Sequence, residues 1–175
     1  EVENKLNEIA TSLKYDLEVL EANAIKEYGN RKEKLVTSDI TNNSVLSGIE
    51  YMTRRIKYNF LSAAACIKFC NLDFIKRNKL YFKVGRLHED ELWTPQLYLK
   101  AERVKFLDFP FYHYVIRSNS ITQSHDMKPN IVSIIKNCKE LEGIYSDQTI
   151  RFRYKRILKD YIARQYMATA SLGNY

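Results

Sequence analysis

Hydrophobic positions recur along this chain with two spacings, which divide it into a mixed first part and a helical end. Spacings of three and four residues predict helices over residues 2–14, 42–58, 91–100, 129–145 and 149–172. Shorter apolar runs predict strands at residues 17–20, 25–28, 63–69, 80–82, 103–107 and 111–116. The fold class that follows is mixed α and β up to about residue 124, with two long helices after it.

Local signals place the turns between these elements. Gly29-Asn30 is turn chemistry, and Asp108-Phe109-Pro110 predicts a turn between the last two strands. Asn42-Asn43-Ser44 is typical of a helix start, and Asn71 opens a short helix. Pro95 fits within the first turn of the helix that contains it, since proline is tolerated there.

Composition narrows the class of protein only a little. The 175 residues suffice for one hydrophobic core, and 45% hydrophobic residues exclude a disordered chain. A formal net charge of +7 favours anionic partners. Three sparse cysteines argue against a disulfide framework, and no second Cys or His pair stands at a zinc-binding spacing, so Cys66 and Cys70 are expected to be buried thiols. No apolar run approaches the roughly 18 residues that span a bilayer.

The most informative stretch of the chain begins at Gly85, which precedes an acidic cluster, His88 to Glu91. If a sharp turn at the glycine leads into a helix, a carboxylate of the cluster can project into a cleft and take a proton from a hydroxyl group. The alternative is helix capping, because acidic residues are stabilised near a helix N-terminus. Trp93 follows directly, and it either stacks on a sugar ring or lies in the core.

A second candidate cluster lies on the last predicted strand and the loop after it. His113 points to the face opposite Tyr112 and Tyr114, where a neutral imidazole could bind a divalent metal. Arg117 and Ser120, in the polar loop that follows, could hold a diphosphate. The alternative is a partly buried histidine on a sheet face, followed by a polar turn.

The final predicted helix is basic, with aromatic residues interleaved in the run RFRYKRILK at 151–159. Such a helix could bind nucleic acid or acidic lipid headgroups. The alternative is a solvated basic face on a helix whose apolar side packs against the rest of the protein. A non-enzymatic basic module spanning 128–164 is therefore a second hypothesis for the function.

Taken together, these motifs resemble the catalytic second half of bacterial family-2 glycosyltransferases, which have the GT-A fold. That family often carries GxxHEDxxW/F, a strand, and YxYxxRxxSI; this chain has GRLHEDELW at 85–93 and YHYVIRSNSI at 112–121. The run CIKFCNLDFI at 66–75 is similar to the family segment WxKLYxxxFL, with the Trp and the Leu-Tyr altered.

The resemblance covers roughly residues 5 to 124, and it implies two parts in this chain. Residues 1–124 would form the acceptor-side part of a GT-A domain, and residues 125–175 a C-terminal helical extension. The donor-binding half, with its Asp-x-Asp metal motif, would precede Glu1. We therefore expect the chain to be a C-terminal portion of a longer enzyme and to be inactive by itself.

The resemblance also implies a role for each candidate residue. Asp90 would be the catalytic base of an inverting transfer from a nucleotide sugar, supported by Glu89. His113, Arg117 and Ser120 would close over the diphosphate, with His113 a tentative metal ligand; Trp93 would line the acceptor site, and His88 would assist nearby.

The resemblance implies partners and a location as well. The full-length enzyme would need a divalent metal, Mg or Mn, held by its other half. Its partners would be a nucleotide-sugar donor and a glycan or lipid-linked acceptor, in bacterial cell-surface polysaccharide synthesis. It would be cytoplasmic, with the basic final helix at the inner membrane face, and nucleic acid is not expected as a partner.

Overall fold

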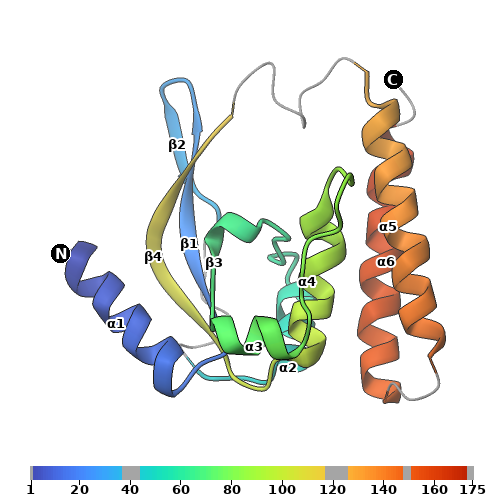
Figure 1. Cartoon of the computed structure of the whole chain (residues 1–175). Helices are drawn as coiled ribbons and strands as arrows, with labels where there is room; N and C mark the ends of the chain where they lie inside the picture. The colour runs from blue at the N-terminus through green and yellow to red at the C-terminus, as the bar shows by residue number, and fades with distance from the viewer. Residues whose placement is uncertain (1, 37–43, 117–125, 148–150, 173–175) are drawn as a thin grey trace.

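The computed structural model describes residues 2–36, 44–116, 126–147 and 151–172, with a four-stranded sheet at its centre (Figure 1). Strand β1 (Val19–Tyr28) pairs antiparallel with β2 (Arg31–Lys34) near its end and with β3 (Lys68–Cys70) near its start. Strand β4 (Val104–Val115) runs parallel along β1. The predicted mixed α/β fold class is confirmed.

Helices cover both faces of this sheet (Figure 1). Helix α1 (Val2–Tyr15) packs on one face over a small apolar cluster that includes Ile9 and Leu20. On the other side lie α2 (Gly48–Lys57), η1 (Ala65–Ile67), α3 (Leu72–Arg77) and α4 (Glu89–Lys100).

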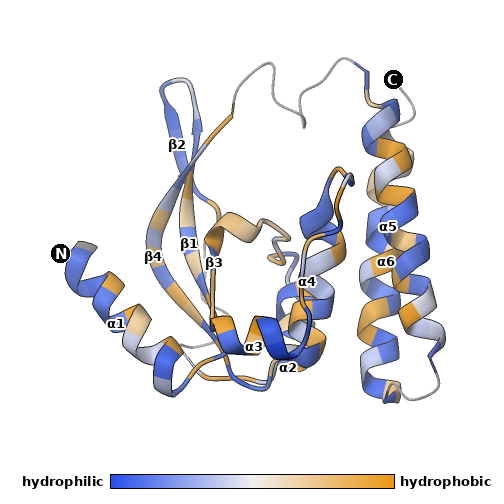
Figure 2. Cartoon of the chain, in the orientation of Figure 1, coloured by the Kyte–Doolittle hydropathy of each residue, from blue (hydrophilic) through white to orange (hydrophobic). Residues whose placement is uncertain are grey.

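The hairpin of α5 (Lys128–Ser146) and α6 (Phe152–Leu172) packs against α4, and one hydrophobic core joins these helices to the sheet. Hydrophilic and hydrophobic residues mix around both helices, while β2 is hydrophilic (Figure 2). None of the helices within the described ranges is long and apolar enough to cross a bilayer.

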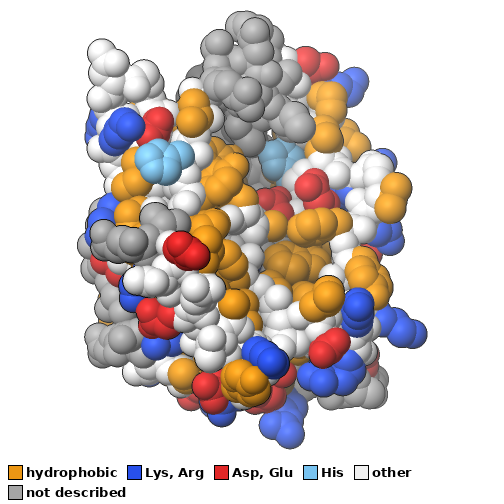
Figure 3. Space-filling model, turned by 60° about the vertical axis from the view of Figure 1, so that its left-hand side comes forward, with side chains coloured by type: hydrophobic (Ala, Val, Ile, Leu, Met, Phe, Trp, Pro, Cys, Tyr) orange, Lys and Arg blue, Asp and Glu red, His pale blue; other side chains and the backbone are white. Residues whose placement is uncertain are grey.

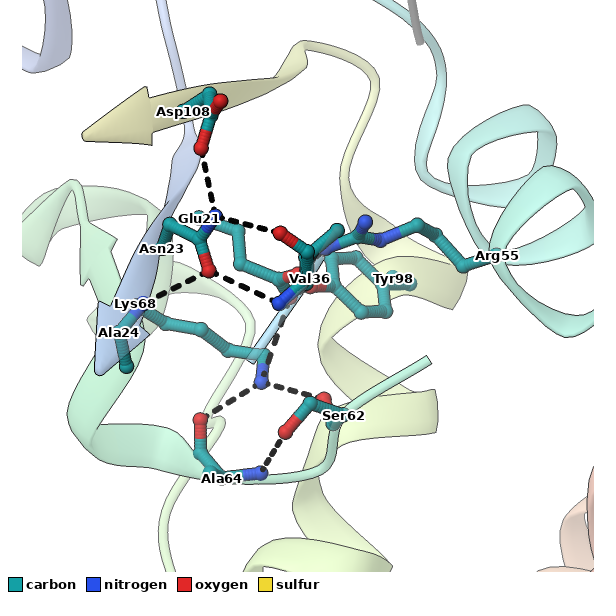
Figure 4. Close-up of polar contacts among 10 residues, drawn as sticks. All are labelled: Glu21, Asn23, Ala24, Val36, Arg55, Ser62, Ala64, Lys68, Tyr98 and Asp108. Carbon is teal, nitrogen blue, oxygen red and sulfur yellow. Dashed lines mark hydrogen bonds and ion pairs between the residues drawn. The ribbon is translucent and has the colours of Figure 1, made fainter. Parts of the chain in front are cut away.

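Strand β1 is continuous where the sequence predicted two short strands. The apolar pattern is interrupted by Glu21 and Asn23, yet both side chains are fully buried. The Asn23 amide donates to the carbonyl oxygen of Val36 at 2.9 Å and its oxygen accepts from the Val36 amide at 3.1 Å (Figure 4). Because each buried polar group finds a partner, the strand continues through a segment that the apolar pattern had excluded.

Strand β4 is also continuous, and the turn predicted at Asp108-Phe109-Pro110 is an irregularity within it. Pairing with β1 shifts between Ala22 opposite Leu107 and Asn23 opposite Pro110, so residues 108 and 109 are extra on β4. Such a bulge bends a strand without ending it. The Asp108 carboxylate accepts from the Asn23 amide at 2.6 Å, which fixes the bulge against β1.

Helix α2 begins at Gly48, later than the predicted start at Asn42. Leu46 is engaged in a β-bridge with Val104, and Ser47 and Glu50 form a reciprocal capping box. A Cβ atom on Gly48 would lie 2.0 Å from the Tyr98 carbonyl oxygen, so only glycine permits this approach of α2 to α4. Residues 42 and 43 lie outside the described ranges.

Three smaller predictions were also wrong. Residues 80–82 form a loop in which Leu80 is buried while Tyr81 and Phe82 point outward. Residues 63–69 are divided between a loop, η1 and the start of β3. Cys66 is exposed, where a buried thiol was predicted, and Cys70 is partly buried. In contrast, α1, the Asn71-capped α3 and both C-terminal helices are confirmed within a few residues.

Candidate active site

The acidic cluster lies at the start of α4 beside a cavity of about 490 Å³, which we call the acidic cavity. Figure 3 shows a hollowed face on which acidic and histidine side chains lie next to hydrophobic ones. The cavity is open to the surface and is lined by residues from five parts of the chain: Lys26 of β1, Leu35 after β2, residues 59–64, His88, Asp90 and Glu91 at α4, and Tyr114 and Ile116 at the end of β4.

Asp90 has the chemistry of a general base in this cavity. Burial, followed by the negative charge of Glu89, raises the pKa of the Asp90 carboxyl, while Lys68 and His88 oppose the rise. A raised pKa strengthens a carboxylate as a proton acceptor, and the nearby Lys68 ammonium group favours its ionised form. All three carboxylates of the cluster lie in the first turn of α4, as the capping alternative also predicts, although the N-cap residue itself is His88 and its side chain makes no capping hydrogen bond.

His88 is held in a left-handed backbone conformation with φ of 53°. This conformation is strained for a residue with a side chain and persists where the surroundings enforce it. Here α5 enforces it: the His88 ring Nε2 lies 2.6 Å from Oδ1 of Asn130, and the Asn137 amide donates to the His88 carbonyl oxygen at 2.7 Å. The C-terminal hairpin therefore shapes the turn that presents Asp90.

Glu91 connects the acidic cavity to α6. Burial raises the pKa of its carboxyl, and hydrogen bonds from the Tyr161 hydroxyl and the Gln165 amide hold it. The same Tyr161 O–H proton is shared with the Glu91 backbone oxygen, which lies 2.9 Å from the hydroxyl. That oxygen lacks its helical partner, because the residue four positions on is Pro95, which has no N–H. Pro95 thus lies in the second turn of α4, beyond the first turn where it was predicted.

Residues 62–64 form a loop in the wall of the acidic cavity, and side chains of β3 and α4 hold this loop in place. The Lys68 ammonium group donates to the carbonyl oxygens of Ser62 at 2.8 Å and Ala64 at 2.9 Å (Figure 4). The Thr94 hydroxyl donates to the Ala63 oxygen at 2.8 Å. Three consecutive carbonyl groups are thereby satisfied, so the loop keeps one shape at the edge of the cavity.

Lys68 belongs to a buried ionic network centred on Glu21. The Glu21 carboxylate forms a salt bridge with the Arg55 guanidinium, lies 3.6 Å from the Lys68 ammonium and accepts from the Tyr98 hydroxyl at 2.6 Å (Figure 4). Although burial opposes it, the two cations and the hydroxyl lower the pKa of Glu21. The charge is therefore retained in the core, where breaking the network would leave an ion without its partner.

Two of the other predicted site residues, Glu89 and Trp93, do not line the acidic cavity. Glu89 does not line the acidic cavity and acts on it through its charge. Trp93 is buried, donates from its indole N–H to the Leu80 oxygen at 3.1 Å and packs on Phe82, which matches the core alternative and not a sugar-stacking surface.

His113 lies outside the acidic cavity, and its Nδ1 is 2.6 Å from the Glu27 carboxylate. Within the described residues no three His, Cys, Asp or Glu side chains converge to hold a metal ion. The described residues therefore form no metal site of their own. The divalent metal that the resemblance implies for the full-length enzyme stays a prediction. Arg117 and Ser120 lie outside the described residues.

Sequence reasoning missed Glu91, Lys68 and Tyr161 as parts of the site. Tyr161 is more than 60 residues away from the acidic cluster and belongs to a helix that no motif connected with it. The only available signal was the helix-interior proline at Pro95, which implies an unpaired carbonyl group in need of a donor.

Comparisons with known proteins find distant similarity to a glycosyltransferase and to solved structures of one other protein. No family model matches the chain. The uncharacterized glycosyltransferase YibD of Escherichia coli (strain K12) is 21% identical over 147 residues, which cover 78% of this chain and 43% of that protein.

Solved structures of S. aureus TarS residues 1–349 are similar over almost the whole chain. The complex with UDP-GlcNAc gives a TM-score of 0.64 at 17% identity, covering 94% of this chain and 45% of that one. The complex with UDP gives a TM-score of 0.60, covering 93% and 43%. The chain thus spans less than half the length of these relatives. The expectation from the sequence is confirmed at the level of the fold: the chain has the fold of part of a glycosyltransferase.

Proposed function

We propose that the protein containing this chain transfers a sugar from a nucleotide-diphosphate sugar to an acceptor hydroxyl, with inversion. The observation that carries the proposal is Asp90: on a glycosyltransferase fold, its carboxylate lines an open cavity and its pKa is raised by burial. Because the similar TarS structure was solved with UDP-GlcNAc, a UDP-sugar is the first donor to test.

In the proposed reaction, the Asp90 carboxylate takes the proton of the acceptor hydroxyl as its oxygen attacks the anomeric carbon. The new carbon–oxygen bond forms while the bond to the diphosphate breaks, and the nucleoside diphosphate leaves with the electron pair. A single displacement of this kind inverts the anomeric centre. Glu89 contributes by raising the pKa of Asp90, which strengthens the base.

The non-enzymatic basic module is the less favoured function. Helices α5 and α6 are not an independent unit in the structure, because they share the main core and hold the acidic cluster through Asn130, Asn137 and Tyr161. We propose a cytoplasmic enzyme of bacterial cell-surface polysaccharide synthesis, with its divalent metal held outside the described residues.

The test is Asp90→Asn in the full-length protein, with UDP release from UDP-GlcNAc as the readout in the presence of candidate acceptors. Loss of a general base should lower the rate by about 10²- to 10⁴-fold. The matched control is Asp73→Asn, because Asp73 is exposed on α3 and does not line the acidic cavity. If both variants retain similar rates, Asp90 is not the base and the proposed mechanism fails.

A further inference from the structure

A row of cavities leads away from the acidic cavity along α6. The acidic cavity shares Asn59, Leu61 and Glu91 with a second cavity of about 520 Å³, which we call the middle cavity. The middle cavity shares Ile56 and Arg164 with a third of about 700 Å³, which we call the basic groove. The three cavities thus adjoin one another through shared wall residues, from the proposed base to the groove between α2 and α6.

Positive charge is concentrated in the basic groove. Four cationic side chains line it, Lys57, Arg153, Arg156 and Arg164, against a single acid, Asp160. Within the described residues none of the four cations forms a salt bridge, and all four are exposed. Arg164 donates to the Asn59 side-chain oxygen at 2.9 Å, and Lys57 lies over the Tyr58 ring. Cations without a salt-bridge partner in a concave surface attract anionic ligands.

The arrangement along α6 fits a chain of anions better than a single one. Arg153, Arg156, Asp160 and Arg164 follow one another at spacings of three and four residues, so they lie on one face of the helix. The 11 positions from Arg153 to Arg164 correspond to about 16 Å at 1.5 Å per residue. Arginine suits phosphate in particular, because its planar group donates two parallel hydrogen bonds.

We propose that the acceptor is a phosphate-bearing chain that lies in the basic groove and reaches Asp90 through the middle cavity. This inference rests on the proposed function and names its acceptor class. Phosphates contact the arginines, while Ile56 and Leu61 pack against the carbon skeleton between groove and base. The concave shape favours a chain over a bilayer surface, which is flat on this scale.

The test measures binding of a short fluorescent polyphosphate to the chain by anisotropy at rising sodium chloride concentration. The variant is Arg153→Glu with Arg156→Glu. The matched control is Lys136→Glu with Lys139→Glu, an equal charge change at two exposed positions of α5 that do not line the basic groove. We expect the groove variant to weaken binding at least about tenfold and to lower the salt slope by about two, one for each lost phosphate contact.

Two further arms test whether the ligand must be an anion and whether a membrane surface can supply it. Neutral dextran oligosaccharide should not compete with polyphosphate, and vesicles of phosphatidylglycerol should bind more weakly than polyphosphate at equal accessible phosphate. Equal losses in the groove and control variants overturn the proposal, because the attraction would then be one of net charge. Binding to the vesicles without binding to polyphosphate also overturns it, in favour of a membrane-surface role.

The two proposals fail separately. In the full-length protein, polyphosphate should inhibit sugar transfer by competing with the acceptor and not with the donor. If Asp90→Asn leaves transfer intact while polyphosphate still binds in the groove, the base assignment falls and the anion site stands. If Asp90→Asn abolishes transfer but polyphosphate competes only with the donor, the acceptor assignment falls and the proposed function stands.

Discussion

Tyr161 carries the contact through which α6 holds the acidic cluster, so Tyr161→Phe tests that dependence directly. The hydroxyl is buried, and its one O–H proton is shared between the Glu91 carboxylate and the Glu91 backbone oxygen, which Pro95 leaves unpaired. A hydrogen bond to a charged group contributes about 1.5–3 kcal/mol. We therefore expect Tyr161→Phe to lower the free energy of unfolding by about 2 kcal/mol near neutral pH.

The assay is urea unfolding at several pH values, because the sign of the pH dependence is fixed by Glu91. Its folded-state pKa is raised, so the folded protein binds more protons and this group makes stability fall as pH rises through that pKa. The Tyr161 hydrogen bond opposes the rise, and its loss raises the pKa further. The stability lost in Tyr161→Phe should thus be largest at pH values above the folded-state pKa of Glu91, where the carboxyl is ionised. The loss should become smaller as the pH is lowered toward the usual pKa of a glutamate side chain.

Tyr166→Phe is the matched control, since Tyr166 is on the same helix and donates to the carboxylate of Glu142, an exposed residue, at 2.9 Å. Removing a hydrogen bond to an exposed group should cost no more than about 1 kcal/mol. If Tyr161→Phe and Tyr166→Phe lose the same stability at every pH, the contact with Glu91 does not hold the cluster and the reasoning is refuted.

Three further predictions concern the packing and charge around the site. Lys68→Met should lower the free energy of unfolding, measured in urea, by about 3–5 kcal/mol, because it breaks a buried ionic network. A loss below about 1 kcal/mol, the contribution of one exposed salt bridge, would contradict this. Gly48→Ala should lower the melting temperature, since its Cβ would meet a carbonyl oxygen at 2.0 Å, whereas Gly143→Ala, with nothing within 4 Å, should not. Glu89→Gln should move the acidic limb of the pH–rate profile to lower pH, because its charge raises the pKa of Asp90; an unmoved limb would remove that role.

The sequence predicted the helices well and the strands less well, for a physical reason. A helix such as α5 shows its apolar face within its own residues, so the spacing reports it directly. Strand β1 contains Glu21 and Asn23, whose burial depends on Arg55, Lys68 and Val36 elsewhere in the chain. These distant partners make the burial of the two polar side chains possible, and a local sequence pattern does not reveal such partners.

The boundaries that failed have similar causes. The predicted turn at Asp108-Phe109-Pro110 contains ordinary turn residues, but the Asn23 amide and the Lys34 ammonium hold Asp108 on the sheet. The predicted helix start at Asn42 was too early, because Leu46 pairs with Val104 of β4 just before α2 begins. In each case a local signal was correct in kind and was outweighed by a contact from a distant segment.

The acidic cluster shows how far a linear motif can go. Three consecutive carboxylates stand in the same helical turn, and their acidic pattern by itself does not distinguish them. In the fold, Glu89 remains outside the acidic cavity, Asp90 lines it, and Glu91 is tied to α6 by Tyr161. Successive helix positions differ by about 100° in direction, so three neighbours must face three environments. Asp90 and Glu91 both line the acidic cavity, and Glu91 is held there by Tyr161 and Gln165, so Asp90 is the member of the cluster that we propose as the proton acceptor.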